Sequence, residues 1–289
     1  MNQTSQTPQE EFSGFSPTWC PGCGDWAIGV AIKRAFQGLN FHPSDVAVVF
    51  GIGCSGNMND FLNAYGLHSL HGRALPNAIG IKIAQHHMPV ICIVGDGDCY
   101  GEGGNHLLHA CRGNHDLTVI VHDNGVYGLT TGQVSPCATK GQKSKSTPQG
   151  TIDAPVNPLA LVLTQGATFI AQGYAGQTPQ LIELIQKGIQ HKGFSLINIL
   201  QPCVTFNKIN TYEYYKDKVY QLEEGYDAAN FASALQKVFE PFTAEKFPLG
   251  VLYQKSSPTF TDQLPQLQKT QLIDNPRFAY FDALIEEFK

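Results

Sequence analysis

The sequence predicts an α/β fold built on a doubly wound parallel sheet. Short apolar runs of strand length alternate with segments of helical periodicity, and we find no internal repeat in the 289 residues. The run 90–94 is apolar throughout, which is typical of a strand buried on both faces of a parallel sheet. The length allows one large domain with an extension.

The expected elements follow in order along the chain. The expected helices are 25–39, 74–86, 104–111, one starting at Pro158, 179–191 and 226–239. The expected strands are 45–50, 90–94, 117–122, 168–171, 194–200 and 249–253. In the first helix we place Trp26, Val30 and Ala31 on one face.

Three parts of the chain differ in character. Residues 1–24 form a polar N-terminal loop, 25–203 the α/β domain, and 204–289 an extension that we expect to contact other subunits. Between 123 and 158 the sequence lacks periodicity and is rich in Gly, Ser, Thr, Lys and Gln. A loop of that length in a compact domain is usually functional.

Composition excludes some classes of partner. The net charge of -5 argues against nucleic acid, and we interpret Lys140, Lys143 and Lys145 as a solvated loop. Charged residues make up 15% of the chain, against about 25% in typical domains. Much of the surface is therefore expected to lie against partner subunits or a cofactor.

The N-terminal stretch MNQTSQTPQEEF has no apolar segment of signal-peptide type, and the longest apolar runs have strand length. We therefore expect a cytoplasmic protein without a membrane partner. In that setting the eight cysteines indicate thiols or metal ligands before disulfides.

Polar side chains follow two expected strands in a pattern that suits a metal-bound diphosphate. Gly95-Asp96-Gly97-Asp98 follows the buried strand, and Asn124 follows the next one. The Asp96 carboxylate, the Asn124 amide oxygen and the Val126 carbonyl are oxygen ligands of the kind that Mg²⁺ prefers. The glycines allow backbone N–H groups to approach phosphates. The alternative without a binding function is a tight Gly-Asp turn with an unrelated Asn-Gly turn downstream.

Gly51-Ile-Gly-Cys-Ser-Gly56 also fits GxGxxG after a strand, which by itself suggests a dinucleotide site. The acidic residue expected on the ribose is missing from the stretch Leu70–Arg73. We interpret the segment as a glycine-rich turn that touches the cofactor and presents Cys54.

Four cysteines can converge on one metal centre. Cys20 and Cys23 form a CxxC pair, and Cys54 and Cys203 each lie just past an expected strand end. Four thiolates suit an iron-sulfur cluster or zinc. One pair with two distant single cysteines favours a cluster, while zinc and unligated thiols remain alternatives. We place Cys92 and Cys111 in the core, and Cys99 and Cys137 as free thiols near the site.

Six ordered motifs together resemble the beta subunit of 2-oxoacid:ferredoxin oxidoreductases, of 2-oxoglutarate synthase type, over about residues 15 to 215. They are Trp19-Cys-Pro-Gly-Cys-Gly24, Gly51-Ile-Gly-Cys-Ser-Gly56, His71-Gly-Arg-Ala-Leu-Pro76, Gly95-Asp-Gly-Asp98, Asn124-Gly-Val-Tyr-Gly-Leu-Thr130 and Gln201-Pro-Cys203. The resemblance implies a thiamine-diphosphate-binding domain of the PP type, and Gly-Asp-Gly followed by Asn is similar to the thiamine-diphosphate motif.

The resemblance also implies the roles of individual residues. A 4Fe-4S cluster would be held by Cys20, Cys23, Cys54 and Cys203, and Mg²⁺ by Asp96, Asn124 and Val126. The residues expected to contact the cofactor are Cys54, Ser55, His71, Gly95, Asp96, Gly97, Asp98, Asn124, Val126, Gly128, Leu129 and Thr130.

The implied reaction is the oxidative decarboxylation of a 2-oxo acid to its acyl-CoA. Thiamine diphosphate does the carbon chemistry, the cluster takes electrons singly, and ferredoxin carries them away. The glutamate that activates the cofactor would come from an alpha, or fused gamma-alpha, subunit that carries the pyrimidine-binding domain. Glu102 follows the diphosphate motif too closely for this role. We expect a dimer of heterodimers.

The segment His71–Pro76 and the short chain resemble the 2-oxoglutarate branch of the family more than the pyruvate branch. This resemblance implies 2-oxoglutarate as the substrate, with pyruvate and branched-chain 2-oxo acids as alternatives. Thr131 stands where similar proteins often carry a lysine that would pair with a substrate carboxylate. Two other kinds of protein also fit parts of the sequence. One is a non-redox thiamine-diphosphate decarboxylase with structural cysteines, and the other is a non-enzymatic cluster protein.

Overall fold

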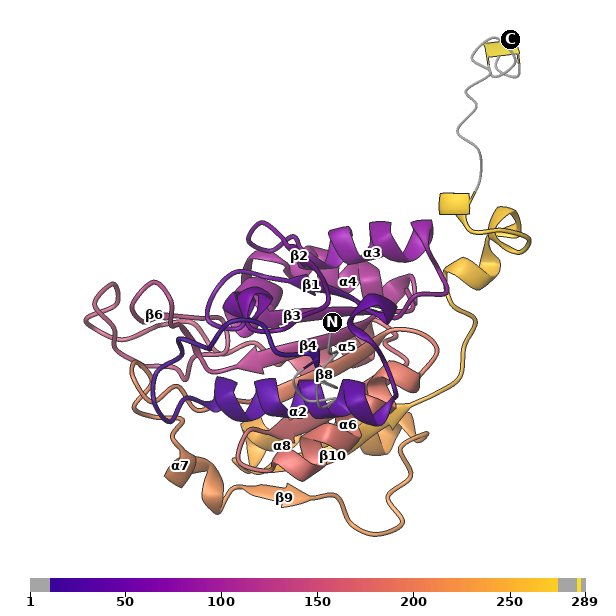
Figure 1. Cartoon of the computed structure of the whole chain (residues 1–289). Coiled ribbons are helices and arrows are strands. Elements are labelled where there is room, and N and C mark those ends of the chain that lie inside the picture. Colours follow the sequence, from indigo (N-terminus) through magenta and orange to yellow (C-terminus); the bar gives the residue numbers. More distant parts are fainter. Residues whose placement is uncertain (1–10, 275–284, 287–289) are drawn as a thin grey trace.

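The computed structural model describes residues 11–274 and 285–286, and it confirms a doubly wound α/β fold (Figure 1). One eight-stranded sheet forms the centre. Its strands, in spatial order, are β2 (Tyr65–His68), β1 (Ala47–Phe50), β3 (Val90–Gly95), β4 (Thr118–Asp123), β8 (Ser195–Leu200), β7 (Phe169–Tyr174), β10 (Phe247–Gln254) and β9 (Val219–Gln221). The first six are mutually parallel, β10 runs antiparallel to β7, and β9 runs parallel to β10.

Helices cover both faces of this sheet, and each face has its own apolar core. The helices are α2 (Gly24–Gly38), α3 (Ala74–Ala84), α4 (Gly104–Arg112), α5 (Pro158–Thr164), α6 (Thr178–Gln190), α7 (Tyr212–Lys216) and α8 (Phe231–Thr243). Helices α2 and α6 lie side by side on one face, where Phe36 and Leu181 are fully buried (Figure 1). Residues of α3, α4, α5 and α8, such as Leu107 and Val162, form the core of the other face. Alternate side chains along each strand serve the two cores.

The first helix starts one residue earlier than expected, and its buried face differs from the prediction. Ala31 is buried, but Trp26 and Val30 are exposed, with 40% and 37% of their surface accessible. The buried face runs instead through Ile28, Ile32 and Phe36. The prediction was wrong because Asp25, in the first turn, is itself fully buried.

Sequence periodicity did not predict the two edge strands. Strand β2 has only four residues, all of them exposed, and β9 has only three residues. The long loop contains a small hairpin of β5 (Val126–Tyr127) and β6 (Gln133–Val134). In the extension, α8 begins later than expected because Asn230 caps it, accepting a hydrogen bond of 3.1 Å from the backbone N–H of Ser233.

Among the described residues, no helix combines the length and the apolar character that crossing a bilayer requires.

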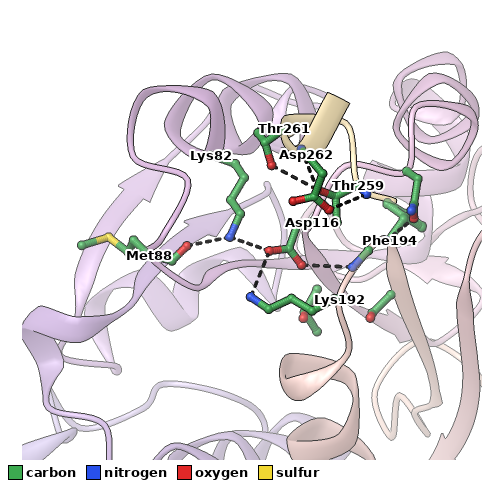
Figure 2. A network of polar contacts seen from close by, with 12 residues as sticks. Lys82, Met88, Asp116, Lys192, Phe194, Thr259, Thr261 and Asp262 are labelled. Atoms are coloured by element: carbon green, nitrogen blue, oxygen red, sulfur yellow. Dashed lines mark hydrogen bonds and ion pairs between the residues drawn. The ribbon is translucent and has the colours of Figure 1, made fainter. Parts of the chain in front are cut away.

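A buried ion pair of Lys82 and Asp116 lies near the amino end of β4, beside the segment that contains Thr259, Thr261 and Asp262 (Figure 2). Lys82 of α3 is 3% exposed, lies 2.8 Å from Asp116 and donates to the carbonyl of Met88. Burial lowers the pKa of Lys82, and the Asp116 carboxylate opposes that shift. Lys192 approaches the same carboxylate at 3.7 Å from an exposed position. The pair lies at the opposite edge of the sheet from the strand ends described below.

We predict that Asp116→Ala lowers the free energy of unfolding by about 3 kcal/mol, because it leaves the Lys82 ammonium buried without a counter-charge. Urea unfolding of the purified chain measures this change. Lys192→Ala is the matched control, since an exposed partner contributes less than about 1 kcal/mol. Equal losses in the two variants would contradict the assignment of Lys82 and Asp116 as the buried pair.

Candidate active site

The loops that carry the sequence motifs meet at the carboxyl edge of the sheet. Strands β1, β3, β4 and β8 are neighbours and parallel, so their carboxyl ends lie together. The loops that follow them contain Gly51–Gly56, Gly95–Asp98, Asn124–Thr130 and Gln201–Cys203. This edge is where open α/β sheets bind ligands.

A pocket of about 80 Å³ opens at this edge, and we call it the polar pocket because Asp96, Asp98 and Asn124 line it. All twelve residues that the sequence predicts as cofactor contacts line it. The lining residues are Ile52, Gly53, Cys54, Ser55, His71, Gly95, Asp96, Gly97, Asp98, Asn124, Val126, Tyr127, Gly128, Leu129 and Thr130. Sequence reasoning missed Ile52, Gly53 and Tyr127 as lining residues, although all three lie inside the quoted motifs.

The turn after β3 is tight because Tyr127 packs over it. Residues Gly97–Glu102 form a π-helical segment, and the Tyr127 hydroxyl donates to the carbonyl of Gly97 and to the carboxylate of Glu102. A methyl group on Gly97 would lie 2.3 Å from the Tyr127 ring. Glycine is therefore required there to keep the ring against the backbone of the turn.

Asp96 lines the pocket and is buried. Its carboxylate accepts hydrogen bonds from the Ser135 hydroxyl and from the backbone N–H of Gly125, the latter at 3.2 Å. Burial, together with the nearby Asp123 carboxylate, raises the pKa of Asp96 to about 8. Burial also raises the pKa of Asp123 to about 6. Two buried carboxyl groups this close favour a cation between or beside them.

Asn124 is held at both ends of its side chain. Its Oδ1 accepts a hydrogen bond of 3.0 Å from the Val126 N–H, and its Nδ2 donates one of 2.7 Å to Oε1 of Gln201. The backbone carbonyl of Asn124 accepts from Asn207 at 2.8 Å. These contacts fix the orientation of the amide, with its oxygen on the side that carries Val126.

His71 lies at the rim of the pocket and is tied to the turn after β3. Its Nδ1 is 2.8 Å from Oδ1 of Asp98 and 3.3 Å from the Glu102 carboxylate. The N–H of Gly72 donates to the same Asp98 oxygen at 2.8 Å. Oδ2 of Asp98 and Oγ of Ser55 are buried without a hydrogen-bond partner. Because Ser55 lines the pocket, its hydroxyl is available to a ligand.

A second cavity, of about 210 Å³, lies beside the first and brings the four predicted cysteines together. We call it the cysteine cavity; it is lined by Thr18, Trp19, Cys20, Cys23, Asp25, Cys54, Asn57, Gly128, Leu129, Thr131, Cys203, Val204, Thr205 and Phe206. The Trp19 indole N–H donates to the carbonyl of Cys54 at 2.8 Å, which joins the N-terminal loop to the loop after β1. Gly22, at φ +81°, allows the CxxC turn.

Of the four cysteines of this cavity, Cys23 and Cys203 are buried, Cys54 is partly buried and Cys20 is exposed. Burial raises the pKa of Cys54 to about 12, and it raises the pKa of Cys23 as well, with Asp25 adding to the effect. The Cys23 thiol donates to Asp25 at 3.2 Å, and the other Asp25 oxygen lies 2.6 Å from Nδ1 of His122. Thiolates in such surroundings need a compensating positive charge, and a metal centre is one source of it.

The polar pocket and the cysteine cavity share a wall. Cys54, Gly128 and Leu129 line both spaces. A methyl group on Gly128 would lie 3.3 Å from Sγ of Cys54 and 3.9 Å from Sγ of Cys203. The bare backbone of Gly128 therefore lets the two spaces approach each other closely.

The remaining four cysteines lie outside this cavity. Cys92 and Cys111 belong to the apolar core, as expected. Cys99 is buried in the same core, and Cys137 lies with Asp96 and Asp123 in a group whose ligand atoms are within 4.8 Å of one another.

The chain matches two family models. Residues 51–199 match the C-terminal TPP-binding domain of thiamine pyrophosphate enzymes, and 203–269 match the C-terminal region of the pyruvate ferredoxin oxidoreductase beta subunit. It is 44% identical over 271 residues to the 2-oxoacid:ferredoxin oxidoreductase subunit beta of Saccharolobus solfataricus, covering 89% of this chain and 88% of that protein. The chain belongs to the beta subunits of the 2-oxoacid:ferredoxin oxidoreductases. Membership in this enzyme family excludes a non-enzymatic cluster protein.

Other members of the family are also similar. The 2-oxoglutarate synthase subunit KorB of Methanocaldococcus jannaschii is 36% identical over 250 residues, covering 86% of this chain and 92% of that protein. A solved structure of 2-oxoglutarate:ferredoxin oxidoreductase from Magnetococcus marinus, with 2-oxoglutarate, coenzyme A and succinyl-CoA bound, superposes with a TM-score of 0.90. That alignment is 36% identical and covers 99% of this beta subunit and 97% of the solved chain.

We predict that Asp96→Ala lowers thiamine-diphosphate retention more than tenfold, because the pocket loses the buried carboxylate proposed to bind the metal, while the iron content stays at the wild-type level. Cofactor and iron analysis of the anaerobically purified beta subunit with its partner measures both. Asp153→Ala, which removes an exposed aspartate of the long loop, is the control. Unchanged cofactor occupancy in the Asp96 variant would remove Asp96 from the metal site.

Proposed function

We propose that this beta subunit binds thiamine diphosphate through Mg²⁺ in the polar pocket and a 4Fe-4S cluster in the cysteine cavity. The magnesium ligands are the Asp96 carboxylate, Oδ1 of Asn124 and the carbonyl of Val126. The cluster ligands are Cys20, Cys23, Cys54 and Cys203. The observation that carries this proposal is the wall that the two spaces share at Gly128.

The donor set supports magnesium. Mg²⁺ prefers carboxylate, amide and carbonyl oxygens and keeps further positions for phosphate and water. The raised pKa of Asp96 means that burial disfavours its anionic form, and a divalent cation offsets that penalty. The unpartnered Ser55 hydroxyl and the start of the segment Gly97–Glu102 supply donors for the diphosphate.

The spacing of the sulfurs supports a cluster over zinc. A tetrahedral zinc ion with Zn–S bonds of about 2.3 Å holds its four sulfurs roughly 4 Å apart. Among the residues that the structure describes, no three cysteine sulfurs lie within 4.8 Å of one another. The cysteine cavity, at about 210 Å³, has room for more than one metal atom. The wider arrangement fits thiolates that each bind a different corner of a cluster.

This chain supplies binding, orientation and the exclusion of water. When bound, thiamine diphosphate supplies the carbon chemistry that decarboxylates a 2-oxo acid. His71, held by Asp98, presents its remaining ring nitrogen at the rim of the pocket. Cys54 and Gly128 line both spaces, so they would set the separation between bound thiamine diphosphate and a bound cluster.

We propose that the site is completed by a partner, an alpha or fused gamma-alpha subunit, which supplies the activating glutamate. Glu102 is the acidic residue at the rim, and it is already engaged by the Tyr127 hydroxyl and His71. Leu129 is 50% exposed at the mouth of the pocket, where a second chain would cover it. Ferredoxin and coenzyme A are the proposed electron acceptor and acyl acceptor.

We propose 2-oxoglutarate as the substrate. Relatives named 2-oxoglutarate synthase and a solved enzyme with 2-oxoglutarate bound support this choice. The distal carboxylate of this substrate requires a cation. None of the residues that line the polar pocket is Lys or Arg, and Thr131 is neutral, so we assign that cation to the partner subunit.

The direct test is anaerobic co-purification with the neighbouring subunit, followed by iron, sulfide and thiamine-diphosphate analysis. A viologen reduction assay with coenzyme A then compares 2-oxoglutarate, pyruvate and branched-chain 2-oxo acids. We expect about four irons and one cofactor per beta subunit, with 2-oxoglutarate giving the fastest reduction. Faster reduction with pyruvate would overturn the substrate, and bound zinc without iron would overturn the cluster.

We also predict that Cys203→Ser lowers the iron content to less than half of wild type and stops ferredoxin reduction. The fold should survive, because Cys203 lies beyond the end of β8 and outside both apolar cores. Iron analysis and circular dichroism measure the two effects. Cys111→Ser is the control, with iron unchanged. Full iron in the Cys203 variant would remove Cys203 from the ligand set.

A further inference from the structure

Gln201 is the first residue after β8, and its side chain lies between the two sets of proposed ligands. The side chain is 1% exposed. Its Oε1 accepts a hydrogen bond of 2.7 Å from Nδ2 of Asn124, and its Nε2 donates one of 3.2 Å to Sγ of Cys23. One amide thus contacts a proposed magnesium ligand at one end and a proposed cluster ligand at the other.

The position of this amide is fixed by its surroundings. The Gln201 N–H continues the pairing of β8 with β4 by donating to the Asp123 carbonyl at 2.8 Å. The N–H of Gly24 donates to the Pro202 carbonyl at 3.2 Å, which brings the start of α2 against the same segment. A methyl group on Gly24 would lie 2.7 Å from Cγ of Gln201. The bare Gly24 therefore allows α2 to close over the Gln201 side chain.

The hydrogen bonds at the two ends of the Gln201 amide require the same orientation of that amide. If Oδ1 of Asn124 binds a cation, its Nδ2 points away and needs an acceptor, which Oε1 of Gln201 provides. A Cys23 thiolate can only accept, so it needs a donor, which Nε2 of Gln201 provides. A glutamine is the uncharged side chain of this length that has an acceptor and a donor at these two positions.

We propose that Gln201 is a positioning residue that couples the two cofactor sites. It keeps the Asn124 oxygen toward the magnesium ion, and it raises the reduction potential of the cluster by donating to the Cys23 sulfur. A hydrogen bond to a ligating thiolate stabilises the more negative, reduced form of a cluster. This inference rests on the proposed function, and it adds a residue that contacts neither metal centre directly.

The test compares Gln201→Leu and Gln201→Glu in the complex with the partner subunit, purified anaerobically. Leucine removes both hydrogen bonds at similar volume, whereas glutamate keeps the acceptor for Asn124 and loses the donor to Cys23. The midpoint potential is measured by a redox titration followed by electron paramagnetic resonance, and cofactor affinity by thiamine-diphosphate binding.

Both variants should lower the midpoint potential of the cluster by about 59 mV, which corresponds to a tenfold change in the one-electron equilibrium constant. Only Gln201→Leu should also weaken cofactor binding severalfold. If either the potential or the cofactor affinity of Gln201→Leu equals the wild-type value, the coupling is overturned. Where Gln201→Leu yields too little folded complex, Gln201→Met undergoes the same two measurements with the same criteria.

Gln172→Leu is the matched control, because Gln172 is equally buried on β7 and donates to the Pro248 carbonyl at 2.9 Å, away from the cysteine cavity. The cluster potential and the cofactor affinity of Gln172→Leu should stay at wild-type values. If both fall as far as in Gln201→Leu, the specific role of Gln201 is overturned. Wild-type complex that lacks iron or thiamine diphosphate would refute the proposed function itself. Wild-type complex that holds both, with an unchanged Gln201→Leu variant, would refute the Gln201 bridge alone.

Discussion

The parallel pairing of β1, β3, β4 and β8 is the constraint on which the site depends. Because these strands are neighbours with one direction, four loops distant in sequence meet at one edge of the sheet. The register of β4 and β8 pairs Asp123 with Leu200, so the next residues, Asn124 and Gln201, lie side by side. Two apolar cores, one on each face, keep the strands in this register.

Charge is the second constraint on this edge of the sheet. Asp25 and His122 form a buried pair, and Asp96 and Asp123 lie close together with raised pKa values. Buried ionised groups are costly unless a partner or a metal compensates them. Binding of the proposed metal centres would offset this cost, and it would couple the stability of the loops to that binding.

Local sequence was sufficient to predict the fold class, and strand-end motifs in a parallel sheet must converge. The twelve predicted residues that line the pocket were named from the family resemblance of those motifs. Local sequence did not predict the exposed strand β2, which has only four residues and no buried face. Asp25 was also missed: an acidic residue in the first turn of a helix usually faces water, and only the tertiary contact with His122 makes it buried. The Gln201 contacts depend on two side chains that are distant in sequence, so no local pattern could predict them.

The proposed arrangement places an iron-sulfur cluster and thiamine diphosphate on opposite sides of Gly128. Anomalous diffraction at the iron edge, from crystals of the anaerobic complex, tests it most directly. We expect an iron peak inside the cysteine cavity, next to Cys54 and Cys203, with cofactor density across the Gly128 backbone. A peak at the zinc edge alone, or iron bound away from these four cysteines, would contradict it.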